Sequence, residues 1–356
     1  MEKCNTRRAK QKTVSKRDSV YVGLDVHKRS VYAAVRINGE LYKTKSLPAG
    51  PETVMKFLEK YLPGLKRVVY EAGPTGYGLA RYLKSKGVPV EVLAPGNIPR
   101  APGAKAKSDR LDCTKLAEEA ENNRQLRPVA VPTEQQEARR QLIRLRNQVT
   151  EQKRRSKQRI RSLFLQYGIP EPVGSEFWNR KNRKEFRDLD LIPDLRFVLD
   201  NLLDDLTHWE ERLKVVNGRL REMVKEPEHQ KQLHLLQSHP GVGEVTAFQV
   251  LTELYQPERF ENAKQVASYV GLAPSVRQSG ETRKSGPLHK AGKNALRSAL
   301  VESSWAWIRQ DAEGARTFRR LARNTGNANK AIVGMARRLV IHLWTMLVTN
   351  QEYRAA

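Results

Sequence analysis

The chain has 356 residues, enough for two or three domains with a sizeable core, and 65 Lys and Arg against 39 acids give it a formal net charge of +26. A positive charge of this size favours a polyanionic partner, with nucleic acid as the first candidate. No apolar run approaches the ~18 residues of a membrane span, and no secretory signal is apparent. The only cysteines, Cys4 and Cys113, form neither a metal-spaced cluster nor a disulfide framework. We therefore expect a cytoplasmic protein that does not bind membranes.

The first third of the chain has the pattern of an α/β domain. Residues 1–18 are basic and polar and are expected to be a disordered tail. Over 19–127, short apolar runs alternate with segments that carry an apolar face of helical period. Asn38-Gly39 is a strong hairpin signal. The expected strands are 20–25, 31–37, 41–46, 67–71 and 88–93, and the expected helices are 51–62, 75–86 and the segment that Ser108 can cap.

The middle of the chain predicts a helical arm over 134–228. After a linker at 126–133, a first long helix over 134–165 becomes strongly basic, and a second over 195–220 has heptad spacing typical of a coiled coil. The segment 169–190 between them is predicted to be a loop. The pattern leaves open whether the two helices form an antiparallel hairpin or a seam between protomers. The predicted seam residues are Leu195, Leu199, Leu202, Leu206, Trp209, Leu213, Val216 and Leu220.

The last part of the chain, 230–350, is predicted to be mostly helical. Expected helices cover 244–254, 263–270, 294–310 and 328–348, with a polar loop over 275–292. Gly241 and Gly243 precede the first of these helices. Their backbone N–H groups could bind a DNA phosphate, as in a helix-hairpin-helix element, or the segment could be an ordinary turn between helices.

Carboxylates at defined positions of the first domain indicate a metal site. Asp25 and Glu71 each end a predicted strand, while Asp109 and Asp112 are three residues apart on one helix and so share a face. Each acid alone is commonly structural, but four like charges held together are unfavourable without a cation. We expect them to converge on one or two Mg²⁺ ions of the kind that promote phosphodiester displacement.

Several motifs together resemble a known family. In the first domain they are Gly-Leu-Asp-Val-His-Lys at 23–28, Tyr-Glu-Ala-Gly-Pro-Thr-Gly at 70–76 and Lys-Ser-Asp-Arg-Leu-Asp at 107–112. Further motifs are Pro-Gly-Val-Gly at 240–243, Ala-Ser-Tyr-Val-Gly-Leu-Ala-Pro at 267–274, Gln-Ser-Gly-Glu-Thr-Arg at 278–283, His-Lys-Ala-Gly-Lys at 289–293 and Ala-Ile-Val-Gly-Met-Ala-Arg-Arg at 331–338. This order resembles the DEDD transposases of the IS one-ten family of bacterial insertion sequences.

The resemblance implies a fold and an activity. The fold would be an α/β RNase H-like (RuvC-like) domain, long coiled-coil helices and a mostly α-helical C-terminal transposase domain. Asp25, Glu71, Asp109 and Asp112 would hold Mg²⁺, and Ser279 would attack DNA to form a covalent phosphoserine link. The family often has Ser-Ser-Gly where this chain has Gln278-Ser279-Gly280, so Ser275 and Ser285 remain alternatives.

The resemblance also implies partners. They are DNA at the element ends and target, a guide ("bridge") RNA, and other copies of the chain in a dimer or tetramer, in a nucleoid-associated bacterial protein. Basic residues near the serine and near the acids are candidate phosphate ligands. They are Arg277, Arg283, Lys284, Lys290, Lys293 and Arg297, with Lys105 and Lys107.

Two other functions fit the sequence less well. A RuvC-like nuclease or junction resolvase would use the acids to activate water and leave the serine idle. A non-catalytic nucleic-acid scaffold would need neither, although the presence of all four acids argues against it.

Overall fold

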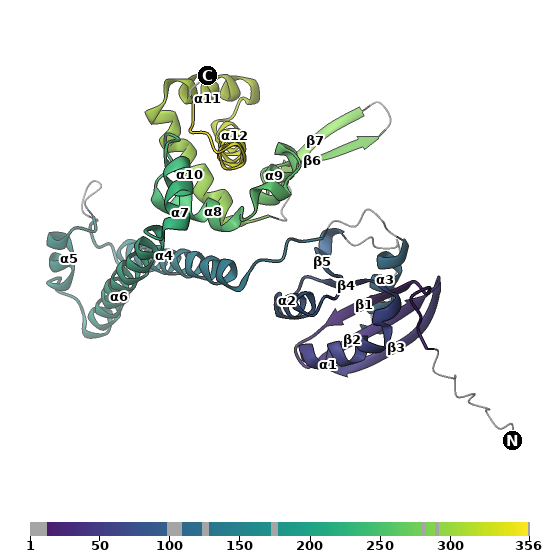
Figure 1. Ribbon diagram of the computed structural model, residues 1–356. Coiled ribbons are helices and arrows are strands. Elements are labelled where there is room, and N and C mark those ends of the chain that lie inside the picture. Colours follow the sequence, from purple (N-terminus) through teal and green to yellow (C-terminus); the bar gives the residue numbers. More distant parts are fainter. Residues whose placement is uncertain are drawn as a thin grey trace. The chain divides into compact units, whose positions relative to one another are not determined.

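The computed structural model describes residues 13–97, 109–122, 128–171, 177–279, 282–288 and 292–354. The chain divides into two compact units, residues 1–133 and 134–356. The first unit is mixed α/β and the second is mostly helical (Figure 1).

A five-stranded sheet forms the centre of the first unit. Its strands are β1 (Val20–Val26), β2 (Ser30–Ile37), β3 (Glu40–Pro48), β4 (Leu65–Glu71) and β5 (Val90–Leu93), in the order β3-β2-β1-β4-β5. The first three strands are antiparallel, while β1, β4 and β5 run parallel to one another. The predicted hairpin is confirmed, because Asn38 and Gly39 both have positive φ between β2 and β3.

Helices cover both faces of this sheet. On one face α1 (Pro51–Leu58) and α2 (Gly78–Ser85) supply Val54 and Leu83 to a core that includes Leu24 and Tyr70. The predicted helix at 51–62 ends earlier, at Leu58, and continues as a 3₁₀ helix over Glu59–Gly64 that contains Pro63. On the other face α3 (Asp109–Asn122) packs against β1, β2 and β4.

The contact between α3 and β1 is made possible by Gly23. A Cβ atom at Gly23 would lie 2.2 Å from the carbonyl oxygen of Cys113 and 2.3 Å from the amide nitrogen of Ala117. Both atoms belong to the helix backbone, so no side-chain rotation can make room. The absence of a side chain at Gly23 therefore fixes how closely α3 approaches the sheet.

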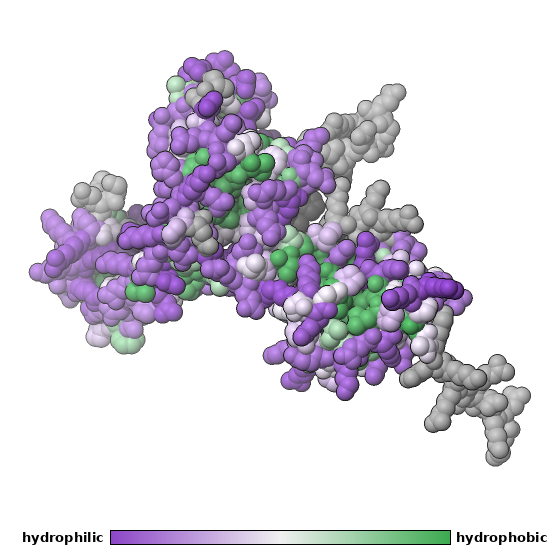
Figure 2. Space-filling view, in the orientation of Figure 1, coloured by the Kyte–Doolittle hydropathy of each residue, from purple (hydrophilic) through white to green (hydrophobic). Residues whose placement is uncertain are grey.

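The second unit begins with a helical hairpin. The helix α4 (Glu134–Gln166) packs along α6 (Pro193–Val224) within one chain (Figure 1). Lys153 on α4 pairs with Glu210 on α6 at 3.1 Å, and Arg146 donates to Asn217 at 2.9 Å. Of the predicted seam residues, Leu202, Trp209 and Leu213 are half-buried, and Leu203, which the prediction did not include, is buried. On the face drawn in Figure 2, hydrophilic residues cover most of both helices.

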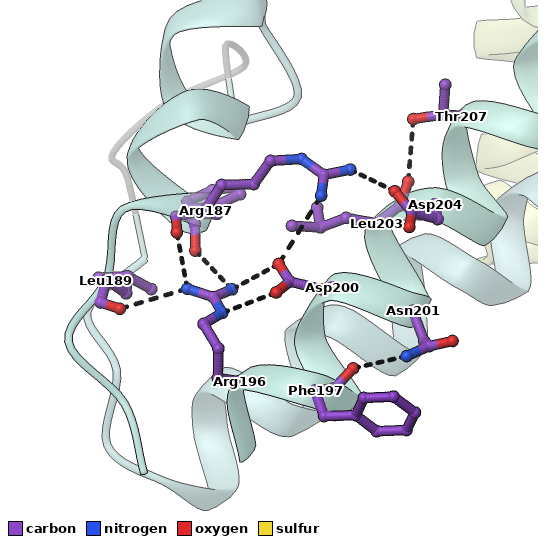
Figure 3. Close-up of polar contacts among 10 residues, drawn as sticks. Arg187, Leu189, Arg196, Phe197, Asp200, Asn201, Leu203, Asp204 and Thr207 are labelled. Atoms are coloured by element: carbon purple, nitrogen blue, oxygen red, sulfur yellow. Dashed lines mark hydrogen bonds and ion pairs between the residues drawn. The ribbon is translucent and has the colours of Figure 1, made fainter. Parts of the chain in front are cut away.

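The predicted loop at 169–190 contains a helix, α5 (Arg180–Arg187), so that prediction is wrong in part. Phe186 from α5 is buried against Phe164 of α4, at a ring-centroid distance of 4.9 Å. Figure 3 shows how arginines fix this end: Arg196 of α6 donates to the carbonyl oxygens of Arg187 at 2.9 Å and Leu189 at 3.2 Å, and Arg187 pairs with Asp204. Tertiary contacts thus stabilise a short, highly charged helix that its own sequence predicts weakly.

The rest of the unit is a helical domain around one central helix. The helix α12 (Ala328–Thr349) contacts its neighbours α7, α9, α10 and α11, and its buried side chains include Met335, Leu339 and Leu343. The other helices of this domain are α7 (Pro227–Gln237), α8 (Glu244–Glu253), α9 (Ala263–Val270), α10 (Asn294–Gln310) and α11 (Ala312–Thr325).

The sequence prediction that no segment approaches a membrane span needs qualification. By length and composition alone α12 could cross a membrane, with a mean hydropathy of 1.5 in its best window. Half of that window is buried inside the protein. Its packing is that of the core helix of a folded domain.

The predicted loop at 275–292 is also wrong in part, because it contains a two-stranded antiparallel sheet. The strands are β6 (Pro274–Ser279) and β7 (Thr282–Leu288), with Ser279 paired to Thr282. The polar composition suggested a loop because these strands lack the apolar alternation of a half-buried strand.

Replacing Gly23 with valine should displace α3. Because backbone atoms occupy the space, the free energy of unfolding should fall by about 3 kcal/mol, at the upper end of overpacking costs. Hydrogen exchange of α3 amides in the full-length protein should accelerate. Gly78→Ala is the control, because a Cβ at Gly78 meets nothing within 4 Å. Unchanged protection of α3 in Gly23→Val would contradict the assigned contact.

Candidate active site

The acids Asp25 and Glu71 lie at the same edge of the sheet. Leu24 on β1 pairs with Tyr70 on the parallel strand β4, and the next residue on each strand is the acid. Successive side chains alternate between faces, so Asp25 lies on the face of Gly23, the face that α3 covers. The same alternation places Glu71 on the face of Val69, which packs against Leu116 of α3. Glu71 itself is exposed.

The first turn of α3 brings two more carboxylates to this edge. Asp109 and Asp112 begin the helix, where acidic side chains also interact favourably with the helix dipole. Possible ligand atoms of Asp25, His27 and Asp109 all lie within 4.8 Å of one another. The side chain of Asp25 is 20% exposed and that of Asp109 is 47% exposed, so the cluster is accessible from solvent.

Burial and charge raise the pKa of Asp25. Loss of hydration is the largest cause, His27 acts in the opposite direction, and the charges of Asp109 and Asp112 raise the pKa further. Burial and the nearby Asp25 likewise raise the pKa of the Cys113 thiol to about 11, so Cys113 is a neutral core residue at pH 7. The carboxylates thus repel one another in the absence of a cation, and their oxygens are the donors that a hard divalent ion prefers.

Sequence reasoning did not identify His27 as a site residue. Its Nε2 lies 3.0 Å from Asp25 Oδ2 and 3.6 Å from Asp109 Oδ1. Strand periodicity could not place it, because β1 ends at Val26 and His27 lies in the connection to β2.

Ser279 belongs to the second unit, at the end of β6. The alternative Ser275 has a structural role in the described hairpin, since its hydroxyl donates to the carbonyl oxygen of Pro287 at 2.9 Å. Backbone pairing places Arg277 opposite Lys284 and Gln278 opposite Arg283, so basic residues occupy both strands beside Ser279. Lys105, Lys107 and Lys290 lie outside the described residues.

Basic side chains gather where this hairpin joins the helices. The buried guanidinium of Arg140 donates to the Tyr269 hydroxyl at 3.2 Å and lies 3.7 Å from Glu253. Arg259 lies over the ring of Tyr269 at 4.7 Å, and its buried Nε and Nη2 have no hydrogen-bond acceptor among the described residues. Lys293 lies 5.6 Å from the centre of the same ring.

The charge of this cluster is unbalanced. Burial lowers the pKa of Lys293, and the nearby Arg140, Arg144 and Arg259 lower it further, against the opposing charge of Glu253. The positive charges of this cluster outnumber the negative charges near them, and such an excess favours an anionic ligand such as a phosphate.

Two other residues that were predicted to bind phosphate, Arg297 and Gly241, form hydrogen bonds within the protein. Arg297 donates to the Gly271 carbonyl oxygen at 3.3 Å and to Asn294 at 2.6 Å. The Gly241 N–H donates to Gln310 at 2.8 Å. Gly241 has a φ of +82°, and a Cβ there would lie 2.5 Å from the Ser303 carbonyl oxygen, so close packing against α10 requires a glycine at this position.

Gly243 differs from Gly241 in its surroundings. It is exposed, caps the N-terminus of α8, and a Cβ there would meet nothing within 4 Å. Of the two predicted phosphate-binding glycines, Gly243 is the one with room for a ligand.

Comparison with known proteins identifies the family of the chain. Residues 22–169 match the transposase family model for the DEDD domain of IS110 elements, and residues 233–319 match the model described as "Transposase IS116/IS110/IS902 family". These matches define a transposase, a protein that acts on DNA. The chain belongs to the IS one-ten (IS110) family.

Relatives from several bacteria share most of the chain. A putative transposase, y4qE, of Sinorhizobium fredii is 31% identical over 85% of this chain and 75% of its own length. The transposase for insertion sequence element IS1533 of Leptospira borgpetersenii is 28% identical over 80% of this chain and 84% of its own. The transposase for insertion sequence element IS1111A of Coxiella burnetii is 25% identical over 81% and 79%.

Replacing Asp25 with asparagine should stabilise the metal-free protein at pH 7. Because the pKa is raised, Asp25 binds its proton more tightly in the folded state than in the unfolded state. The free energy of unfolding therefore falls as pH rises from 3.8 to the folded pKa, and it stays at this lower value above that pH. Asparagine does not ionise, so the variant does not lose this stability. The excess stability of Asp25→Asn, measured by chemical denaturation, should therefore shrink as pH falls towards 3.8. Equal stabilities at pH 7 would contradict the assigned cost of ionising the partly buried Asp25 beside Asp109 and Asp112.

Replacing Lys293 with methionine should weaken DNA binding in a salt-dependent way. If Lys293 neutralises one phosphate, the slope of log affinity against log salt should decrease by about 0.9. Fluorescence anisotropy with a labelled duplex measures this slope. Lys264→Met is the control, because Lys264 is exposed on the neighbouring helix α9. Equal slopes for the two variants would remove Lys293 from the phosphate-binding set.

Proposed function

We propose that the chain is a DNA recombinase that moves its insertion sequence through a covalent phosphoserine intermediate. The observation that carries the proposal is the convergence of Asp25, Asp109 and the α3 first turn at one sheet edge, in a family whose members are transposases. The second unit carries Ser279 in a β-hairpin whose two strands also carry basic residues.

The strand order supports an RNase H-like (RuvC-like) assignment for the first unit. A sheet ordered β3-β2-β1-β4-β5, with three antiparallel strands followed by two parallel ones, is the arrangement that this fold implies. The acids lie at the carboxyl ends of β1 and β4, the edge where open α/β sheets commonly bind ligands.

The donor set fits a divalent cation, and we propose Mg²⁺. Asp25 and Asp109 would hold it, with Asp112 and Glu71 completing the set, because each lies at the same sheet edge or on the same helix turn. When bound, the ion supplies positive charge that stabilises negative charge on phosphate oxygens. The four acids are thereby relieved of their mutual repulsion.

Ser279 is the proposed nucleophile. Its Oγ forms a bond to phosphorus while the bond from phosphorus to a deoxyribose oxygen breaks, the serine proton is released, and the leaving oxygen takes up a proton. A second transfer reverses this chemistry on another strand. Both transfers exchange one phosphate ester for another, so strand exchange needs no external energy source.

The remaining chain would bind nucleic acid and other copies of itself. The basic cluster around Arg259 and Lys293 is suited to the DNA backbone, as is the exposed N-terminus of α8 at Gly243. The helical arm over 134–228 would contact a bridge RNA and a partner protomer in a dimer or tetramer. We place the activity in the bacterial cytoplasm, at the nucleoid.

The Ser279→Ala variant should lose covalent adducts and keep DNA binding. Incubation with a labelled element end followed by a denaturing gel detects the adduct, and anisotropy measures binding. Ser275→Ala and Ser285→Ala are matched controls from the same hairpin and should retain adducts. Adducts that persist in Ser279→Ala and disappear in a control would assign the nucleophile to that other serine.

The same gel distinguishes the alternative of a water-activating nuclease or junction resolvase. Such an enzyme would cut DNA in the presence of a divalent ion but leave no DNA bound to protein in any variant. The acidic cluster alone supports this alternative, because it contains no protein nucleophile. Absence of any cleavage by the wild type would favour the non-catalytic scaffold.

A further inference from the structure

The position of His27 beside the acids is not explained by the four-carboxylate site. His27 follows β1 directly, and its Nε2 is within 3.0 Å of one carboxylate oxygen and 3.6 Å of another. Its side chain is 46% exposed, so burial of apolar surface does not account for its placement.

The fold holds the imidazole in this position. The His27 N–H donates to the Ser30 carbonyl oxygen at 2.9 Å, which closes the tight connection to β2. The ring contacts Tyr32 edge-on at a centroid distance of 6.3 Å, and Tyr32 is the cross-strand partner of Asp25. Backbone and ring contacts therefore aim Nε2 at the space between Asp25 and Asp109.

Imidazole changes the chemistry of a carboxylate site. A neutral histidine with its proton on Nδ1 offers the Nε2 lone pair as a ligand. Mg²⁺ strongly prefers oxygen ligands, whereas nitrogen ligands raise affinity along the series from Mn²⁺ to the later transition metals. A mixed set of one nitrogen and two carboxylates is therefore expected to discriminate among divalent ions.

We propose that His27 is a direct ligand of the cation held by Asp25 and Asp109, and that its nitrogen makes this site prefer Mn²⁺ to Mg²⁺. The inference rests on the metal site of the proposed function, adds a residue to it, and changes the preferred ion from the Mg²⁺ that the four acids alone suggest to Mn²⁺. It requires no movement of the backbone, because the three possible ligand atoms already lie within 4.8 Å of one another.

The test is electron paramagnetic resonance of Mn²⁺ bound to the full-length protein. Electron spin-echo modulation should reveal a ¹⁴N nucleus coordinated to Mn²⁺ in the wild type and lose that signal in His27→Ala. Mn²⁺ affinity, measured by titration of the free-ion signal, should fall at least about tenfold in His27→Ala, as expected for loss of a group that tunes a metal site. Mg²⁺ affinity, measured by competition, should change much less.

Two variants make the outcome specific. His208→Ala removes a histidine of the arm and should keep both the nitrogen signal and the Mn²⁺ affinity. His27→Gln replaces the nitrogen with an amide oxygen that can still reach the carboxylates, and should bind Mn²⁺ without the imidazole signal. Rescue of the Mn²⁺ preference by glutamine would show that the nitrogen is not responsible.

The results that overturn this proposal differ from those that overturn the proposed function. Mn²⁺ bound without a nitrogen signal in the wild type, or a signal that persists in His27→Ala, rejects His27 as a ligand and leaves the carboxylate site intact. Tighter Mn²⁺ binding in His27→Ala would mean that the imidazole competes with the ion. Failure to detect any Mn²⁺ that depends on Asp25 rejects the metal site, while the serine adduct assay remains an independent test of recombination.

Discussion

The close approach of α3 to β1 at Gly23 is the constraint on which the acidic site depends. The helix backbone occupies the space where any other residue would carry a Cβ, with 2.2 Å between that position and the Cys113 carbonyl oxygen. Since α3 begins at Asp109, the same contact sets the distance between its first turn and the end of β1. A glycine two residues before Asp25 thus controls the geometry of a site to which it contributes no ligand.

That geometry is unfavourable in the absence of a cation. Burial is the largest cause of the raised pKa of Asp25, and the charges of Asp109 and Asp112 at the same edge of the sheet raise it further. Evolution tolerates such local destabilisation mainly where it serves function. Apolar packing elsewhere in the unit, including the fully buried Leu24 and Tyr70, offsets this loss of stability.

The second unit has the opposite electrostatic character at its hairpin. Arg140, Arg259 and Lys293 meet near Tyr269 with Glu253 as the nearby acid, and aromatic rings stabilise the guanidinium groups. Under the proposed function, a phosphodiester would complement both kinds of charge, because it would satisfy the cations directly and reach the carboxylates through a divalent ion.

Some parts of this architecture were predictable from local sequence. The five strands, the hairpin at Asn38-Gly39 and the long helices follow from apolar periodicity and turn residues, which act over a few neighbouring positions. The candidate acids Asp25, Asp109 and Asp112 were identified because they stand at the ends of such elements. The family was identified from the order of several short motifs.

Other features depended on contacts between distant residues. The helix α5 forms because Phe186 packs on Phe164 and Arg196 binds its last carbonyl groups, and the strands β6 and β7 form by pairing with each other. The burial of Leu203 in place of Leu202 follows from the exact rotation of α6 against α4.

The sequence by itself therefore determined the five strands of the first unit, the long helices and most candidate ligands, because these depend on local periodicity and residue chemistry. Only the tertiary structure decided that His27 faces the carboxylates, that Gly241 packs against α10, and that Lys293 joins buried arginines. Each of these contacts forms only when packing brings residues from different segments of the chain within a few ångströms of one another.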